Sequence, residues 1–190
     1  MKILIWHRGI SVLLFDSFTD VNGTGLAAHA MNVGGGWTVL SGSYTIQGNK
    51  ARGGTAATQN FAVANAGQKD VAVSAVGNTP TNAQRMGLLA RVTDVNNFWW
   101  FYFDTNANSI YVYERVAGVD TARASAAQAY ASNTDFALQV NVSGTRITAT
   151  VNGGNVISFA SMSTGLSATK HGIDTYDVGG TLDNFQVTTP

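Results

Sequence analysis

Apolar and polar residues alternate with a period of two along much of the chain, and the stretch from Met86 to Arg115 is the one around which the rest is organised. Three strand-like runs stand there, Met86–Val92, Phe98–Asp104 and Ser109–Arg115, joined by short polar connections. Successive side chains of a strand point to opposite faces, so the six consecutive aromatic residues from Phe98 to Phe103 must divide between two faces. We therefore predict three paired antiparallel strands that present large side chains on both sides.

The pairing register decides which side chains share a face. If Phe103 lies opposite Ile110, then Phe101 lies opposite Val112. This face is wholly apolar, and we expect it to face the core. The other face combines aromatic rings with polar groups, which suits it to stacking and hydrogen bonding. It is the predicted ligand-binding face, for a glycan or a protein, and its members are Arg91, Trp100, Tyr102, Tyr111 and Tyr113. A slip of one residue would exchange the faces.

The same period predicts strands along the rest of the chain. These are Val12–Phe18, Trp37–Leu40, Tyr44–Gln47, Gln59–Ala64, Asp70–Val76, Thr121–Ala126, Phe136–Val142, Ile147–Val151, Val156–Phe159, His171–Tyr176 and Thr181–Thr188. Trp37–Leu40 and Tyr44–Gln47 are expected to form a hairpin around Ser41-Gly42-Ser43. The alanine-rich stretch Ala117–Ser132 could form a helix by propensity, but its neighbours favour a strand. Within the glycine-rich loop Asn22–Gly36, Leu26–Met31 could make a helical turn.

Turn signals such as Ser143-Gly144 and Asn152-Gly153 follow one another every eight to twelve residues, which is typical of an antiparallel sandwich or barrel. No linker or repeat divides the chain. We predict one all-β domain over residues 12–190, preceded by an arm over residues 1–11. A signal peptide does not fit the arm, because His7, Arg8 and Gly9 interrupt its apolar run. Its apolar residues Ile3–Trp6 are expected to pack on a neighbouring subunit or a host protein.

Composition excludes several classes of function. Eleven basic and eleven acidic residues give a net charge of zero, so no basic patch indicates nucleic acid as a partner. Cysteine is absent, which removes disulfides and thiolate metal sites. The apolar runs are too short for membrane insertion.

Four stretches in order resemble the concanavalin A-like lectin/glucanase superfamily, near its laminin-G-like branch. They are Leu13–Trp37 with its aromatic-Asp-x-Phe strand, the paired strands of Gly87–Asp104, the Asn-Gly hairpin of Ile147–Phe159, and Gly172–Val187 with its Asp-Asn-Phe. The resemblance covers residues 12–188 and implies a two-sheet antiparallel jelly-roll sandwich. Chains this rich in Gly, Ala, Thr and Asn also resemble modules of bacteriophage tail fibres and capsid decorations.

The resemblance raises two questions about sites. Related jelly rolls clamp their ends with calcium where Asp16 and Asp183 fall. Two carboxylates are few for a tight calcium site, which favours the alternative that both side chains accept backbone hydrogen bonds at strand ends. Glycosidases of the superfamily need two carboxylates on one face. Here Glu114 is the only glutamate, and its register places it beside Trp99, away from the predicted ligand-binding face. The three histidines have no metal-ligand spacing.

These observations predict a non-catalytic module on a virion or other extracellular surface, with structural and adhesive roles. Its expected partners are other virion proteins, a second copy of itself, or a cell-surface glycan. No cofactor is expected to be required, and the calcium considered above would serve a structural role only. The alternatives are a secreted lectin-like carbohydrate-binding domain and, third, a glycoside hydrolase.

Overall fold

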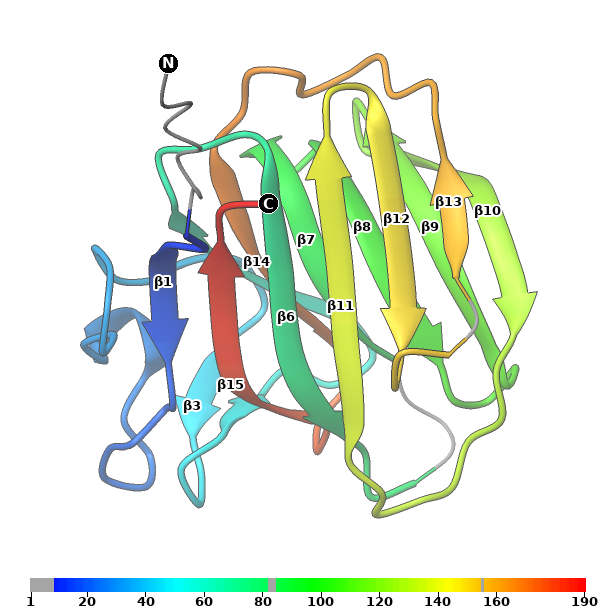
Figure 1. Ribbon diagram of the computed structural model, residues 1–190. Helices are drawn as coiled ribbons and strands as arrows, with labels where there is room; N and C mark the ends of the chain where they lie inside the picture. The colour runs from blue at the N-terminus through cyan, green and yellow to red at the C-terminus, as the bar shows by residue number, and fades with distance from the viewer. Residues whose placement is uncertain (1–8, 82–84, 155) are drawn as a thin grey trace.

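The protein is a sandwich of two antiparallel sheets that face each other (Figure 1). The computed structural model describes residues 9–81, 85–154 and 156–190. One sheet has the order β13-β12-β11-β6-β15-β4-β3, with β1 added to β15, and the other has the order β10-β9-β8-β7-β14-β5-β2. The predicted all-β, two-sheet jelly-roll architecture is thereby confirmed.

The eight-stranded sheet forms the front layer in Figure 1. Its strands are β1 (Val12–Asp16), β3 (Tyr44–Ile46), β4 (Ala51–Gly53), β6 (Val71–Asn78), β11 (Phe136–Ser143), β12 (Arg146–Val151), β13 (Ile157–Phe159) and β15 (Thr181–Thr188). The seven-stranded sheet lies behind it. Its strands are β2 (Thr38–Ser41), β5 (Gln59–Asn65), β7 (Arg85–Asp94), β8 (Asn97–Asp104), β9 (Ser109–Val116), β10 (Val119–Ala127) and β14 (Lys170–Tyr176). A single 3-10 turn, Leu26–Ala28, interrupts the loop between β1 and β2.

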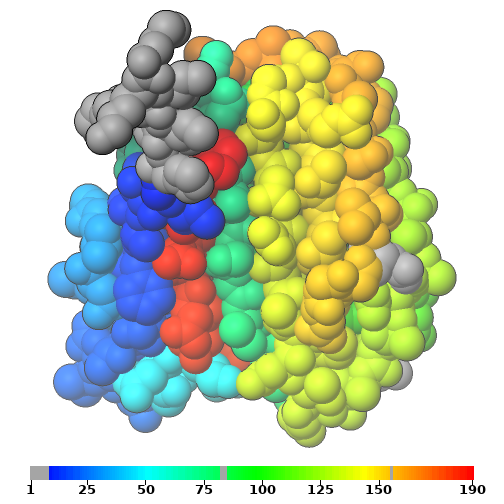
Figure 2. Space-filling model, in the orientation of Figure 1, coloured from blue at the N-terminus to red at the C-terminus, as the bar shows by residue number. Residues whose placement is uncertain are grey.

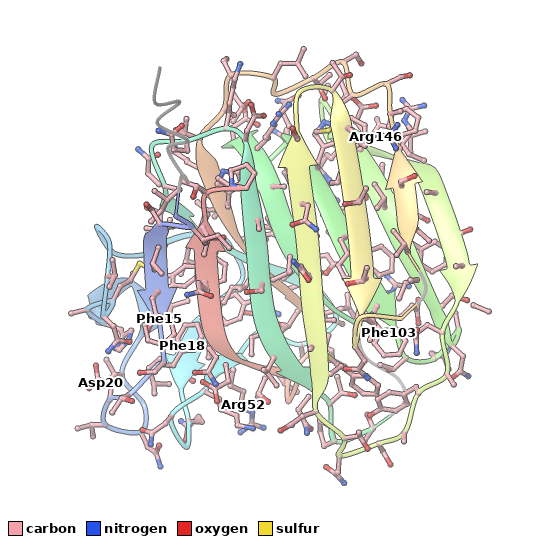
Figure 3. All side chains as sticks on the ribbon, viewed as in Figure 1. Phe15, Phe18, Asp20, Arg52, Phe103 and Arg146 are labelled. Atoms are coloured by element: carbon pink, nitrogen blue, oxygen red, sulfur yellow. The ribbon has the colours of Figure 1, made fainter. Side chains whose placement is uncertain are left out.

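The main core lies between the sheets and is built by alternate residues of each strand. Phe101, Phe103 and Ile110 from the seven-stranded sheet meet Val140 and Phe185 from the other sheet in one buried cluster. Phe103 can be followed into this space in Figure 3. The predicted register is confirmed, because Phe103 pairs with Ile110 and Phe101 pairs with Val112. The apolar face of the central strands is therefore the core face.

The alanine-rich stretch is a strand, because β10 pairs with β9 along its length. Tertiary context outweighs the helix propensity of alanine here. A strand beside β9 provides hydrogen-bond partners for the backbone groups at that edge of the sheet. The hairpins at Ser143-Gly144 and at Asn152-Gly153 also form as predicted.

The predicted hairpin of Trp37–Leu40 with Tyr44–Gln47 is wrong. β2 pairs with β5 in the seven-stranded sheet, whereas β3 pairs with the unpredicted β4 in the other sheet. Gly42 has a positive φ of 63° and lies against the Asn60 side chain, so the chain crosses between sheets there. The turn signal was real, but a turn alone does not reveal whether the next strand returns to the same sheet.

The described part of the arm is short. Ile10 is largely exposed, and Ser11 exchanges hydrogen bonds with Thr189 at the other end of the chain. The expected packing of Ile3–Trp6 concerns residues outside the described ranges. In the described ranges, no helix has the length and hydropathy needed to cross a membrane.

Candidate functional site

The outer face of the seven-stranded sheet carries a second buried cluster, separate from the core between the sheets. We call it the aromatic cluster; its buried members are Phe61, Val63, Leu89, Val92, Phe98, Trp100 and Tyr102, with Leu40, Val95, Tyr111 and Tyr113 packed against them. The view in Figure 2 looks onto the opposite, eight-stranded side of the sandwich. Strand alternation produces this cluster, because β8 has large side chains at every position.

Rings from distant strands meet in the middle of this face. Phe61 on β5 and Trp100 on β8 are separated by β14 and β7, a span of about 14 Å at ordinary strand spacing. Their ring centroids are nevertheless 5.5 Å apart. The rings lean together because the strands between them have glycine at Gly87 and Gly172, where a side chain would collide with a neighbouring strand's backbone. The glycines thus create a hollow that the aromatic side chains fill.

Two arginines lie over the rings. The Arg115 guanidinium is 5.1 to 5.4 Å from the centroids of Phe61, Phe98 and Trp100, and it forms a two-point ion pair with Asp120 at 2.6 and 2.7 Å. At the other end, Arg85 lies over Tyr102 and Tyr176 and pairs with Asp104 at 3.0 Å. A cation over an aromatic face stabilises such a surface, and the charged head of the arginine stays in contact with water.

Four of the five predicted ligand-binding residues lie together on this face. Trp100 pairs with Tyr113 and Tyr102 pairs with Tyr111, as the register predicted. Trp100 and Tyr102 are only 3% and 6% exposed, while Tyr111 and Tyr113 are half-buried and form the accessible rim. Burial and the neighbouring Tyr113 raise the pKa of Tyr102, so its hydroxyl stays neutral. The binding role of these residues remains a prediction.

The predicted place of Arg91 on this face is wrong. Arg91 has a positive φ of 49° within a bulge between Ala90 and Asp94. A bulge adds a residue and reverses the alternation that follows it. Val92 therefore joins the aromatic cluster. Arg91 is fully buried elsewhere, and its guanidinium donates hydrogen bonds to the carbonyl oxygen of Lys69 at 3.2 Å and to the carboxylate of Asp70 at 2.7 Å.

Asp174 is the residue of this face that the sequence analysis missed. It lies on β14 between Gly87 and Phe61, in line with Tyr102 and Tyr111 across the sheet. Its side chain is fully buried and neither carboxyl oxygen has a hydrogen-bond partner. Burial raises the pKa of Asp174 well above its ordinary value, against the opposing influence of Arg85 and Arg115. The available signal was a lone carboxylate in the middle of the predicted strand His171–Tyr176.

Glu114 lies where the register predicted, paired with Trp99 and directed away from the aromatic cluster. It is 2% exposed, and both carboxylate oxygens are engaged: Arg123 donates to Oε2 at 2.6 and 3.0 Å and Thr164 donates to Oε1 at 2.6 Å. A carboxylate held in this way supports the end of the sandwich, and its oxygens do not face the aromatic surface.

The two candidate calcium ligands have different surroundings. Asp16 is fully buried; its Oδ1 accepts from the Phe18 amide and is 2.9 Å from His29 Nε2, and its Oδ2 accepts from Trp37 Nε1 at 2.6 Å. Asp183 is half-buried and accepts a hydrogen bond from the Asn184 amide. Among the described residues, no group of three or more histidine, aspartate or glutamate side chains is arranged to hold a metal ion. The geometry matches the hydrogen-bonding role, and calcium binding here remains a prediction.

Comparisons with known proteins identify the fold. Neither a family model nor a curated protein matches the sequence. Among solved structures, the carbohydrate-binding module CBM66 from Bacillus subtilis has a TM-score of 0.70 at 14% identity, covering 83% of this chain and 98% of that one. The CBM2 module of the evolved Dit protein of Lactobacillus casei BL23 phage J-1 has a TM-score of 0.61 at 10% identity, covering 94% and 95%.

An enzyme is similar as well. SCLam, a non-specific endo-beta-1,3(4)-glucanase from family GH16, has a TM-score of 0.66 at 8% identity, covering 96% of this chain and 92% of that one. These likenesses concern the fold alone: the chain has the two-sheet jelly-roll sandwich that these binding modules and this glucanase share. That fold hosts both binding modules and hydrolases, so function must be argued from the site.

Proposed function

We propose that the protein is a non-catalytic glycan-binding module that serves attachment on a virion or another extracellular surface. The observation that carries the proposal is the aromatic cluster, with its rim of half-buried Tyr111 and Tyr113 on the outer face of the seven-stranded sheet. Aromatic rings stack on the C–H faces of sugars, and tyrosine hydroxyls hydrogen-bond to sugar hydroxyls. The similarity to carbohydrate-binding modules supports the same reading.

The proposal of a binding module over a hydrolase rests on the carboxylates. Hydrolysis of a glycosidic bond needs two carboxyl groups that flank it. On the aromatic face Asp104 and Asp120 are ion-paired with arginines, which leaves Asp174 as the unpaired acid among the described residues there. Glu114 is bonded to Arg123 and Thr164. A single unpaired carboxyl group cannot act both as the general acid and as the base or nucleophile.

The virion setting is the finer part of the proposal. It is supported by the composition and by the similarity to a module of a phage J-1 protein over nearly the whole of both chains. A secreted lectin-like domain would use the same face. Co-purification with intact particles distinguishes the two, since a secreted lectin is not retained on them.

The test is binding of the purified protein to a panel of immobilised glycans, compared with Tyr111→Ala and Gln139→Ala. Gln139 is exposed on the outer face of the other sheet and serves as the matched control. We expect Tyr111→Ala to weaken glycan binding by about 1–3 kcal/mol, the range for an aromatic contact at a binding site, and Gln139→Ala to leave it unchanged. Equal binding by all three proteins would contradict the proposed site. Release of reducing sugar by the wild type would contradict the non-catalytic assignment.

A further inference from the structure

We propose that Asp174 is the polar anchor of this face and hydrogen-bonds to a hydroxyl group of an uncharged sugar. The inference rests on the proposed glycan-binding function and adds its specificity-determining residue and its ligand class. The geometry that points to it is a buried carboxyl group with no protein partner at the centre of an aromatic surface.

Unsatisfied polar atoms concentrate on this one face. The described residues contain five buried side-chain nitrogen or oxygen atoms without a hydrogen-bond partner. Both oxygens of Asp174, Trp100 Nε1 and Gln59 Oε1 are four of them, and strand parity places all three side chains on the outer face of the seven-stranded sheet. Buried polar groups without partners destabilise a fold, so a cluster of them indicates a ligand that supplies the missing bonds.

The set of unsatisfied groups matches hydroxyl chemistry. The indole N–H of Trp100 can only donate, the amide oxygen of Gln59 can only accept, and a carboxyl group can accept in either protonation state. A sugar hydroxyl both donates and accepts, so a single sugar could bond to each of these groups. The half-buried rings of Tyr111 and Tyr113 at the rim offer the apolar surface on which the sugar's C–H face stacks.

The charges on this face favour an uncharged sugar. Arg115 is already paired with Asp120, and Arg85 is already paired with Asp104. An acidic sugar would have to displace one of these carboxylates to gain an arginine. A neutral sugar meets no such competition.

Access to Asp174 requires side chains to move. Arg115 lies over Phe61, Phe98 and Trp100, and its ion pair with Asp120 is at the partly exposed edge of the face. Rotation of Arg115 breaks its side-chain hydrogen bonds to Asp120 and its ring contacts but no backbone hydrogen bond of the sheet, and side-chain rotation is fast. Arg115 can therefore swing aside without disturbing the sheet.

The test compares wild type with Asp174→Leu, Asp174→Asn and the control Asp135→Asn, which changes an exposed aspartate beside β11 of the other sheet. Glycan binding is measured by titration on neutral and uronic-acid-containing sugars, and thermal melting is measured in parallel. We expect Asp174→Leu to lose at least about tenfold in affinity for the neutral sugar while melting at or above the wild-type temperature, because an unsatisfied buried group has been removed. Asp174→Asn keeps a donor and an acceptor and should retain most of the affinity, as should Asp135→Asn.

Three results would overturn the anchor role: wild-type affinity in Asp174→Leu, a strongly lowered melting temperature in both Asp174 variants, or preference for the acidic sugars. The first would leave the proposed function standing, because the wild type would still bind glycans. A wild type that binds no glycan would instead refute the proposed function, and the anchor role with it.

Discussion

At the scale of single residues, burial sets the properties of the ionisable groups in the sandwich. His171 is fully buried, with Nε2 2.9 Å from the carbonyl oxygen of Gln68 and Nδ1 accepting from the Arg91 amide at 3.4 Å. These partners fit the neutral ring, with its proton on Nε2. Burial lowers the pKa of His171 to about 4, and the charge of Arg91 acts in the same direction. The folded protein therefore resists protonation at a site that the unfolded chain protonates readily.

This difference predicts a loss of stability in acid. The unfolded chain takes up the proton near pH 6.5 and the folded protein near pH 4, so stability is lost as pH falls through this window. At pH 4.5 the loss from this residue should be about 2–3 kcal/mol. Urea denaturation at pH 7 and pH 4.5 measures it, and His171→Gln, which does not titrate, should have a smaller difference between the two pH values. An equal difference in both proteins would assign the acid sensitivity to other groups.

Arg91 and Asp174 mark the limit of what alternation predicts about individual side chains. Trp100, Tyr102, Tyr111 and Tyr113 were placed correctly because their strands are regular. Arg91 was misplaced because a bulge depends on local backbone geometry that a period-two pattern does not encode. Asp174 was missed because its strand pairs with β7 and β5 across long stretches of chain, and nothing in the local pattern brings it among the aromatic residues.

At the scale of elements, a network around Asp16 holds the long connection from β1 to β2. His29 lies between two carboxylates, with Nε2 2.9 Å from Asp16 and Nδ1 2.9 Å from Asp20. Trp37 at the end of the connection donates to Asp16. Phe18 and Asp20, which belong to this connection, are labelled in Figure 3. The network fastens a segment with little regular structure, where only a 3-10 turn of the suggested helical region forms.

Asp16→Asn should weaken this network strongly. It leaves buried donors without a charged acceptor and should cost about 3 kcal/mol of unfolding free energy. Burial alone would lower the pKa of His29, but its hydrogen bonds to Asp20 and Asp16 outweigh burial, so the net pKa is raised. The imidazolium's contribution is thus full below about pH 6.5 and is lost as pH rises through the raised folded pKa.

Denaturation of wild type and Asp16→Asn across pH 6 to 9 checks both statements. The wild type should lose stability on the alkaline side, and the variant should lose less because its His29 has one carboxylate fewer. A variant as stable as wild type would contradict the network's role. A wild-type melting temperature that falls with a chelator would instead support calcium at Asp16 and Asp183.

Strand positions were predictable because period-two alternation is a local property, and sheet membership was less so. The hairpins β11–β12 and β12–β13 follow from their turns, whereas Gly42 carries the chain from β2 in one sheet to β3 in the other. The short β4 has only the three residues Ala51–Gly53, too few for alternation to stand out.

At the scale of the whole molecule, the two sheets differ in how many faces they bury. β6 and β11 alternate between buried and accessible residues, because one face of their sheet is solvated. β8 is buried at seven consecutive positions, because the aromatic cluster covers its outer face and the main core covers its inner face. In the described ranges no third layer of strands or helices lies over this outer face, and such extensive burial is unusual for an antiparallel sheet, where one face is commonly solvated. It is the feature that separates the aromatic face from ordinary surface.

The two clusters should respond differently to the loss of one ring. Phe101 is enclosed between the sheets, so Phe101→Ala leaves a cavity that the sheets cannot close and should cost about 3–5 kcal/mol. Trp100 lies under movable side chains, Arg115 and Tyr113, which can settle into the vacated space, so Trp100→Ala should cost about 2–3 kcal/mol. Denaturant unfolding of both variants, with glycan binding of the folded proteins, makes the comparison. We expect Trp100→Ala to remain folded and lose binding; if it costs as much stability as Phe101→Ala, the aromatic cluster is a second core that stabilises the sheet, and the ligand site must lie elsewhere.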